Sequence, residues 1–182
     1  DREKAALLTL YFQGNSPQVI AEKTGLKTEE IENFISGLEA EGFFSEREAG
    51  AGEFTGVYLE LTGRCNLSCV YCYNYPPGKE DFPENRLPSL ILEARTAGAR
   101  DLILSGGEPL LYPGLSALLK FATPLLPVSL VTNATLITPE WAHFFSELPN
   151  FRLEVSLEGF SPEINDPLRG EGSFQKIQRG LD

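Results

Sequence analysis

Residues 57–73 read VYLELTGRCNLSCVYCY, a strand-like run followed by a loop that holds every cysteine of the chain. The run at 57–62 is rich in aromatic and apolar residues, which predicts a β-strand. Cys65, Cys69 and Cys72 follow it with C-x3-C-x2-C spacing. Three closely spaced thiols are a poor disulfide framework but a reasonable metal or cluster site in a reducing compartment. The spacing alone leaves the fourth ligand of such a site open.

Composition narrows the class of protein. The chain has 182 residues, of which 42% are hydrophobic and 23% charged, as expected of a globular protein with one good core. No apolar run is long enough to cross a bilayer and no signal-peptide pattern is present, so we expect a cytoplasmic protein without a membrane partner. The net charge of −11, from 15 basic and 26 acidic residues, argues against a nucleic acid partner.

Beyond the first strand, strand-like and helix-like patterns alternate. Alternation of this kind predicts βαβ units and a parallel sheet, with the loops that follow the strands gathered at one edge. Four such units are visible, and we expect the last to be cut by the end of the chain. The expected strands are 57–62, 101–105, 127–132 and 151–157, and the expected helices are 87–98, 114–123, 139–147 and 173–182.

The chemically distinctive residues all follow these strands. The cysteines come after the first strand and the sequence SGGEP (105–109) after the second. Asn133 ends the third strand, and Ser156 and Glu158 end the fourth. A zinc site would require a fourth Cys or a His. The only His, His143, lies on an expected helix far along the chain, so structural zinc is the weaker alternative to an iron–sulfur cluster with one open iron.

Together, CNLSCVYC and SGGEP resemble the two signature motifs of the radical S-adenosylmethionine (SAM) superfamily. The resemblance covers about 55–182 and implies an α/β fold, the first four units of a partial parallel (β/α)6 barrel. It implies that Cys65, Cys69 and Cys72 hold a [4Fe–4S] cluster whose open iron binds SAM. Tyr71 would then lie near the adenine, and Gly106, Gly107 and Glu108 would meet the methionine ammonium group.

The sequence at 156–174 extends this resemblance. The pattern SLEG…ND…RG.GSF is similar to a stretch of radical SAM enzymes that carry a C-terminal SPASM or twitch extension. It implies that Ser156 and Arg169 contact the ribose or carboxylate of SAM, and that Asn133 reaches the ribose. The chain departs from the family pattern at three positions, with Glu158 in place of Asp, Asn165 in place of His and Ala134 in place of Gly.

Residues 1–52 form a separate expected domain, and residues 53–182 form the barrel domain, truncated on its C-terminal side. Apolar spacing with signals at Ser16, Pro17, Gly25 and Thr28 resembles a winged helix-turn-helix. The helix at 28–42 would be its recognition helix, but it carries five glutamates and no Lys or Arg, which disfavours DNA binding. Two interpretations remain for this domain: docking of a peptide or protein, and packing against the barrel.

The resemblance implies an oxidoreductase-like enzyme. A one-electron reductant would reduce the cluster, SAM would be cleaved to methionine and a 5′-deoxyadenosyl radical, and the radical would abstract hydrogen from a substrate. The first hypothesis for that substrate is a peptide or protein, which would make the enzyme a maturase. The second is a small molecule, such as a tetrapyrrole of the haem pathway. A non-catalytic metal-binding scaffold is the alternative of another class. No catalytic side chain that completes the radical step can be named from the sequence.

Overall fold

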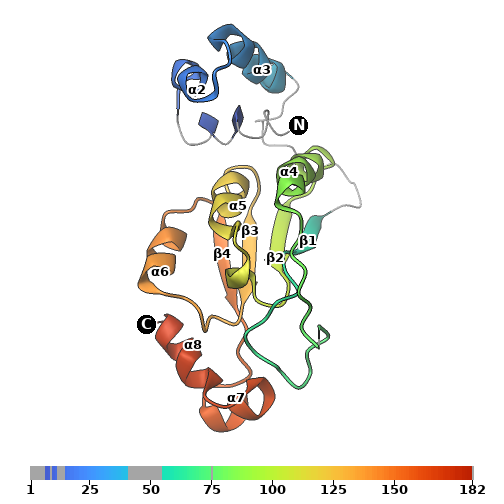
Figure 1. Cartoon of the computed structure of the whole chain (residues 1–182), viewed down its shortest axis with the longest axis vertical. Coiled ribbons are helices and arrows are strands. Elements are labelled where there is room, and N and C mark those ends of the chain that lie inside the picture. The colour runs from blue at the N-terminus through green and yellow to red at the C-terminus, as the bar shows by residue number, and fades with distance from the viewer. Residues whose placement is uncertain (1–6, 9, 12–14, 41–54, 75, 182) are drawn as a thin grey trace.

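The computed structural model describes residues 7–8, 10–11, 15–40, 55–74 and 76–181. Its centre is a four-stranded parallel sheet whose spatial order follows the chain, β1-β2-β3-β4 (Figure 1). A row of leucines in register crosses it, from Leu59 through Leu104 and Leu130 to Leu153. The strands are β1 (Gly56–Glu60), β2 (Asp101–Ser105), β3 (Val128–Thr132) and β4 (Phe151–Val155). The predicted α/β fold, a partial barrel of four βα units, is therefore confirmed.

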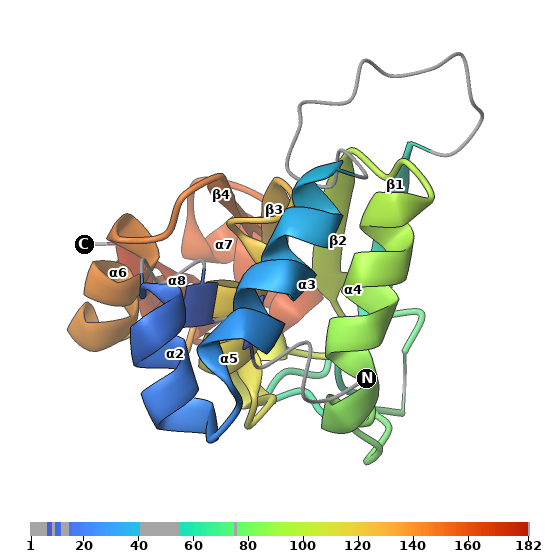
Figure 2. The same ribbon diagram turned by 90° about the horizontal axis from the view of Figure 1, so that it is seen from above.

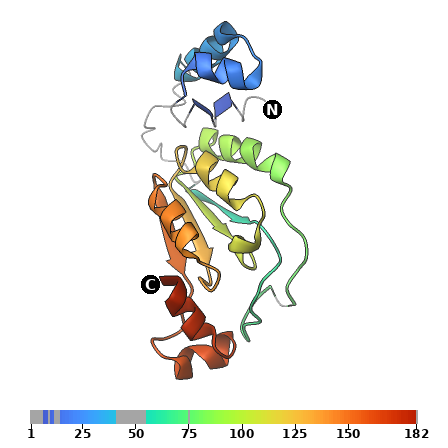
Figure 3. The same ribbon diagram turned by 60° about the vertical axis from the view of Figure 1, so that its left-hand side comes forward.

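Three helices cover one face of this sheet, as Figure 3 shows most clearly. They are α4 (Leu87–Thr96), α5 (Leu115–Ala122) and α6 (Pro139–Ser146), and short 3-10 turns η1 (Glu84–Arg86) and η2 (Pro109–Leu111) precede α4 and α5. Leu102, Leu104 and Leu130 point toward them and are fully buried in the main core. Each of these helices lies within two residues of its predicted range. Burial of one sheet face against helices is the principal source of stability in such a layer.

Alternate residues of the strands point to the other face. Tyr58, Glu60, Arg152 and Glu154 are exposed there, whereas their neighbours Leu59 and Leu153 pack into the core. The period of two is the geometric consequence of the pleat. The sheet is thus apolar toward its helices, whereas its open face combines exposed polar residues with the half-buried Ile103 and Val131.

The N-terminal helices are α2 (Pro17–Thr24) and α3 (Thr28–Ala40). As predicted, Ser16 caps α2, and Gly25 ends it with a φ of 76°. Ile20, Ile31 and Ile35 form a small core of their own, while Phe34 and Leu38 pack against the main core. Figure 2 looks down on this end of the molecule, which lies beyond the N-terminal ends of the strands. The predicted wing and the linker near residue 52 lie outside the described residues.

Two further helices, α7 (Pro162–Arg169) and α8 (Ser173–Leu181), lie at the opposite end, below the C-terminal ends of the strands (Figure 1). Helix α7 was missed from the sequence, because two prolines and few apolar residues disguise it. Asp166 joins the two helices by accepting hydrogen bonds from the main-chain N–H groups of Gly172 and Phe174 and from the Ser173 hydroxyl. These bonds lower the pKa of the Asp166 carboxyl.

Candidate functional site at the carboxyl edge of the sheet

The three cysteines lie on a loop that leaves β1 and returns before η1. Its two ends are joined at the base, where Thr62 pairs with Asp81 as an antiparallel bridge. Gly63 N–H donates to the Glu80 carbonyl and Phe82 N–H to the Leu61 carbonyl, both at 2.8 Å. The cysteine loop, residues 63–80, is therefore closed at its base rather than free at both ends.

A side-chain ion pair reinforces that base. Arg64 donates to both carboxylate oxygens of Asp81, from Nε at 3.1 Å and from Nη2 at 2.8 Å. The same Nη2 reaches the carbonyl of Leu111 at 2.6 Å, and the Thr62 hydroxyl also donates to Asp81. The Thr62 hydroxyl first, and then Arg64, hold the pKa of Asp81 below its usual value. Arg64, the residue before Cys65, is thus bonded to Asp81 at the end of the cysteine loop and to Leu111 after β2.

The glycine pair of SGGEP packs against Thr62 and Arg64, where the chain enters the cysteine loop. Gly107 N–H donates to the Thr62 carbonyl and Glu108 N–H to the Arg64 carbonyl, both at 2.7 Å. Gly106 has a φ of 135°, and a Cβ there would overlap the Thr62 carbonyl; a Cβ on Gly107 would overlap the Arg64 carbonyl. The structure therefore gives both glycines a packing role against the chain that enters the cysteine loop. Their contact with SAM stays a prediction.

Glu108 is fully buried and joins the ends of β2 and β3. Its Oε1 accepts the Thr132 hydroxyl at 2.6 Å and the Leu110 N–H at 3.0 Å, and its Oε2 accepts the Asn133 N–H at 2.8 Å. Burial raises the pKa of this carboxyl, and the three hydrogen bonds oppose that shift. Glu108 therefore links the turn after β2 to the end of β3 through hydrogen bonds. Its predicted pairing with the SAM ammonium group stays a prediction.

Asn133 brings the third strand to the cysteine loop. Its Nδ2 donates to Asn66 Oδ1 at 2.9 Å and lies 4.0 Å from the Cys65 sulfur. Thr135 completes the network: its hydroxyl donates to Asn133 Oδ1 and accepts from Asn66 Nδ2, both at 2.7 Å. The neighbouring Ala134 is fully buried with a φ of 60°, a left-handed conformation at the position where the family pattern has glycine.

All three thiols are free and half-buried. Burial raises the pKa of the Cys65 and Cys69 thiols, and at Cys69 the charge of Arg169 opposes this rise without cancelling it. The Leu67 N–H points to the Cys65 sulfur at 3.4 Å. Within the described ranges, no three His, Cys or acidic side chains are grouped to hold a single metal ion.

On the far side of the loop, Tyr71 and Arg169 meet at Glu158. The Tyr71 hydroxyl and two guanidinium nitrogens of Arg169 all donate to Glu158 Oε1. The guanidinium carbon lies 5.7 Å from the centre of the Tyr71 ring. Ser156 lies two residues before Glu158, directly after β4, and its main-chain N–H donates to the Thr132 carbonyl at 2.9 Å. The structure thus brings Tyr71 and Arg169 together, and Glu108 and Asn133 together, around the cysteines.

Sequence reasoning missed four residues of this site: Arg64, Asn66, Asp81 and Thr135. Their partners lie far away along the chain, so local spacing gave no signal for them. His143, which the sequence places on a helix far from the cysteines, is exposed on α6, and its Nε2 lies 3.6 Å from Glu147 Oε1.

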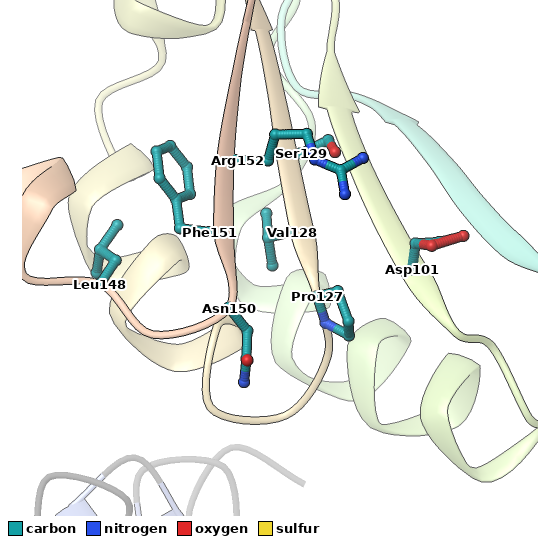
Figure 4. Close-up of a pocket in the computed structure, with 8 residues that line it drawn as sticks. All are labelled: Asp101, Pro127, Val128, Ser129, Leu148, Asn150, Phe151 and Arg152. Carbon is teal, nitrogen blue, oxygen red and sulfur yellow. The ribbon is translucent and has the colours of Figure 1, made fainter. Parts of the chain in front are cut away.

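A cavity of about 310 Å³ opens at the other edge of the sheet (Figure 4). Asp101, Ser129 and Arg152 line one side of it, and Leu148 and Phe151 lie on the other. It lies at the N-terminal ends of β2, β3 and β4, with no thiol in its lining. The cysteine edge, not this cavity, carries the distinctive chemistry.

The family model of the radical SAM superfamily matches residues 59–182. The chain belongs to this superfamily. Curated relatives agree: the chain is 36% identical over 138 residues to a "Probable GTP 3′,8-cyclase" of Methanosarcina mazei, covering 70% of this chain and 41% of that protein. It is 37% identical over 133 residues to the "AdoMet-dependent heme synthase" of Methanosarcina barkeri, covering 69% of this chain and 38% of that protein.

The "Mycofactocin maturase MftC" of Mycobacterium tuberculosis is 35% identical over 126 residues, covering 67% of this chain and 32% of that protein. The radical SAM chain therefore spans only about a third to two-fifths of the length of these relatives. Among solved structures, anSMEcpe with bound AdoMet and the Cp18Cys peptide has a TM-score of 0.58 at 26% identity, covering 71% of this chain and 39% of that one. SuiB of Streptococcus suis has a TM-score of 0.60 at 18% identity, covering 98% of this chain and 45% of that one, a likeness of fold alone.

Radical SAM proteins use a [4Fe–4S] cluster and SAM. The residues present fit these cofactors. Reduced thiolates are the ordinary ligands of iron–sulfur clusters. Here three free thiols share one loop at the carboxyl edge of the sheet.

Proposed function

We propose that this protein is a radical SAM enzyme in which Cys65, Cys69 and Cys72 hold a [4Fe–4S] cluster. When bound and reduced by a one-electron donor, the cluster would supply the electron for reductive cleavage of SAM to methionine and a 5′-deoxyadenosyl radical, which would take hydrogen from the substrate. The single observation that carries the proposal is the cysteine loop itself. Its three free thiols are held at the carboxyl edge of a parallel sheet, where α/β folds place their catalytic groups.

The side chains around the loop would bind SAM. Arg169 offers a guanidinium for the carboxylate or ribose, because its planar donors match paired oxygens. Tyr71 would lie along the adenine, Asn133 and Ser156 would reach the ribose, and the Gly106–Glu108 turn would meet the ammonium group. Arg169 and Tyr71 already lie together beside Cys69, which supports their assignment to one ligand.

The test is reductive cleavage of SAM by the full-length protein. Anaerobic reconstitution with iron and sulfide, followed by dithionite and SAM, is expected to yield 5′-deoxyadenosine, detected by liquid chromatography. Replacing all three cysteines by Ser is expected to abolish both iron binding and the product. His143→Ala is the matched control, because it removes the only other soft metal ligand of the chain without touching the loop. An intact, reducible cluster that leaves SAM uncleaved would favour the non-catalytic scaffold and end the enzyme proposal.

For the substrate, we favour a peptide or protein, with residues 1–52 as its docking domain and the SPASM or twitch type as the subgroup. The relative MftC is a maturase by name, and the likeness of fold to SuiB extends over 98% of this chain. The helices α2 and α3 have a small core of their own, which supports a separate domain, and Phe34 and Leu38 attach that domain to the main core. We place the reaction in the reducing cytoplasm, where the thiols stay unpaired; none of the described helices could span a membrane.

The position of that unit sets a condition on the peptide. The helices α2 and α3 lie beyond the N-terminal ends of the strands, and the cysteine loop lies at the opposite end (Figure 3). A five-residue strand is roughly 17 Å long, so a docked peptide needs at least about five extended residues to pass the sheet. A precursor whose docking segment and modified residue are separated by less than that should bind and remain unmodified.

A small-molecule substrate is the second candidate. The haem synthase and the GTP cyclase are as similar to this chain as the maturase is, at 35–37% identity. Binding of a short precursor peptide, abolished by deletion of residues 1–52, would favour the maturase. Turnover of a tetrapyrrole or a nucleotide without any peptide would favour the small-molecule enzyme.

A further inference from the structure

Glu158 is the meeting point of three parts of the site. Its Oε1 accepts hydrogen bonds from the Tyr71 hydroxyl of the cysteine loop and from Nε (3.2 Å) and Nη2 (2.8 Å) of Arg169, the last residue of α7. The Arg169 side chain is only 9% exposed, so its charge needs a nearby counter-ion. Within the described part of the chain, Glu158 is the carboxylate that pairs with it.

Two neighbouring contacts fix the same junction. The Val70 N–H donates to the Leu168 carbonyl at 2.9 Å, which joins the main chain of the cysteine loop to α7. Below it, the fully buried Asn165 accepts the Glu158 N–H at 3.3 Å and donates to the Ser173 hydroxyl at 2.8 Å. Asn165 therefore fixes the main chain of Glu158, while the Glu158 carboxylate binds Tyr71 and Arg169.

The donor geometry leaves part of Arg169 free for a ligand. A guanidinium has five N–H donors, and Glu158 engages only Nε and Nη2. Among the described residues, Nη1 has no hydrogen-bond partner. One guanidinium can thus bridge Glu158 on one side and a second anion on the other. The Tyr71 ring lies under the same guanidinium, so one carboxylate orients both groups.

We infer that Glu158 is a positioning residue for SAM: it aims Arg169 at the SAM carboxylate and holds Tyr71 in place for the adenine. This inference rests on the proposed function. The family pattern has Asp at this position, and the longer side chain of Glu spans the distance to both partners from the loop after β4. Removal of Glu158 should weaken SAM binding through Arg169 rather than by direct contact.

The test is the affinity of reconstituted, unreduced protein for radiolabelled SAM by equilibrium dialysis, which requires no turnover. Glu158→Ala should weaken binding about tenfold, the worth of a lost charge-assisted hydrogen bond, and Glu158→Gln should weaken it less because an acceptor oxygen remains. Arg169→Ala should weaken binding at least as much. In the double variant, the loss of Glu158 should add no more than about twofold, because most of its effect passes through Arg169 and only the remainder through Tyr71. Glu171→Ala removes an exposed carboxylate two residues from Arg169 and should leave the affinity unchanged.

Each other outcome has a distinct meaning. Glu158→Ala protein that binds SAM like the wild type, or effects of the two single variants that add in full, would overturn the positioning role. Iron and sulfide content is measured on every variant. If both Glu158 variants lose the cluster, Glu158 serves the cysteine loop and not SAM, which also overturns the inference. Wild-type protein with an intact cluster that does not bind SAM would instead refute the proposed function.

Discussion

Gly107 packs directly against the main chain of Arg64, and a Cβ at Gly107 would overlap the Arg64 carbonyl. The next residue, Glu108, donates its N–H to that same carbonyl at 2.7 Å. The backbone of the SGGEP turn therefore fixes the position of Arg64, the residue that precedes Cys65. The two signature motifs of this chain are therefore in direct packing contact.

Gly107→Ala should lower the free energy of unfolding by about 2–3 kcal/mol, because backbone must move to admit the methyl group. Urea denaturation measures the change. Gly37→Ala is the matched control: Gly37 is exposed within α3 with nothing near its Cβ position, so the same substitution should stabilise by about 0.5–1 kcal/mol. Equal effects at the two positions would contradict the packing role.

Glu108→Gln should destabilise the fold by about 1–3 kcal/mol although the side chain keeps its size. Both oxygens of Glu108 accept a main-chain N–H, from Leu110 and from Asn133. Either orientation of the amide turns its NH2 group toward one of these donors. Unfolding in urea at neutral pH would show the loss of stability, and an unchanged midpoint would argue that the carboxylate does not link β2 to β3.

The same pair of proteins should differ in pH dependence. Burial raises the folded-state pKa of Glu108 above its usual 4.5, so the folded state binds the proton more tightly than the unfolded chain. That contribution is fully present below the unfolded value and is lost as the pH rises through the raised pKa. The unfolding free energy of the wild type minus that of Glu108→Gln should therefore fall as the pH is raised from about 4.5. A difference that grows over that range would mean that the hydrogen bonds outweigh burial.

Asn66→Ala and Asn133→Ala should each cost about 1–2 kcal/mol and speed the release of iron from reconstituted protein to a chelator. The two amides bond to each other and share Thr135 beside Cys65. Their effects should therefore be less than additive in the double variant. Asn33→Ala, on the exposed face of α3, should change neither quantity. Full additivity would separate the two asparagines into independent sites.

Ala134 should tolerate glycine and reject valine. Its left-handed φ of 60° costs about 1–2 kcal/mol, which Gly would relieve. Lost methyl burial of about 0.8 kcal/mol and the greater freedom of unfolded glycine offset that gain, so Ala134→Gly should lie within about 1 kcal/mol of the wild type. Ala134→Val should cost at least about 2 kcal/mol by overpacking a buried, strained position. Thermal unfolding of the pair gives the comparison.

The strands and most helices could be predicted from the sequence because their signals are local. The strand at 101–105 is marked by its run of apolar residues, and Ser16 and Thr28 mark helix starts that the structure confirms. The position of the cysteines at the carboxyl edge followed from chain direction alone. Helix α7 was missed because Pro162 and Pro167 resemble a loop and Asp166 serves it through tertiary bonds.

The tertiary hydrogen bonds and ion pairs that assemble the site could not be predicted, for a different reason. Arg64 meets Asp81 and Leu111, and Tyr71 meets Glu158, across separations that no local pattern encodes. The sequence marked Glu158 only as a departure from a family pattern. Its role depends on which atoms surround it in space.

The spatial order of the strands also has a consequence in time. Because β1 to β4 are laid side by side in the order of synthesis, a ribosome delivers the cysteine loop first and its partners afterwards. Glu108 arrives with the second unit, Asn133 with the third, and Glu158 and Arg169 with the fourth. The thiols are thus made early and enclosed late, which leaves an interval during translation in which they are open to iron delivery and equally to oxidation.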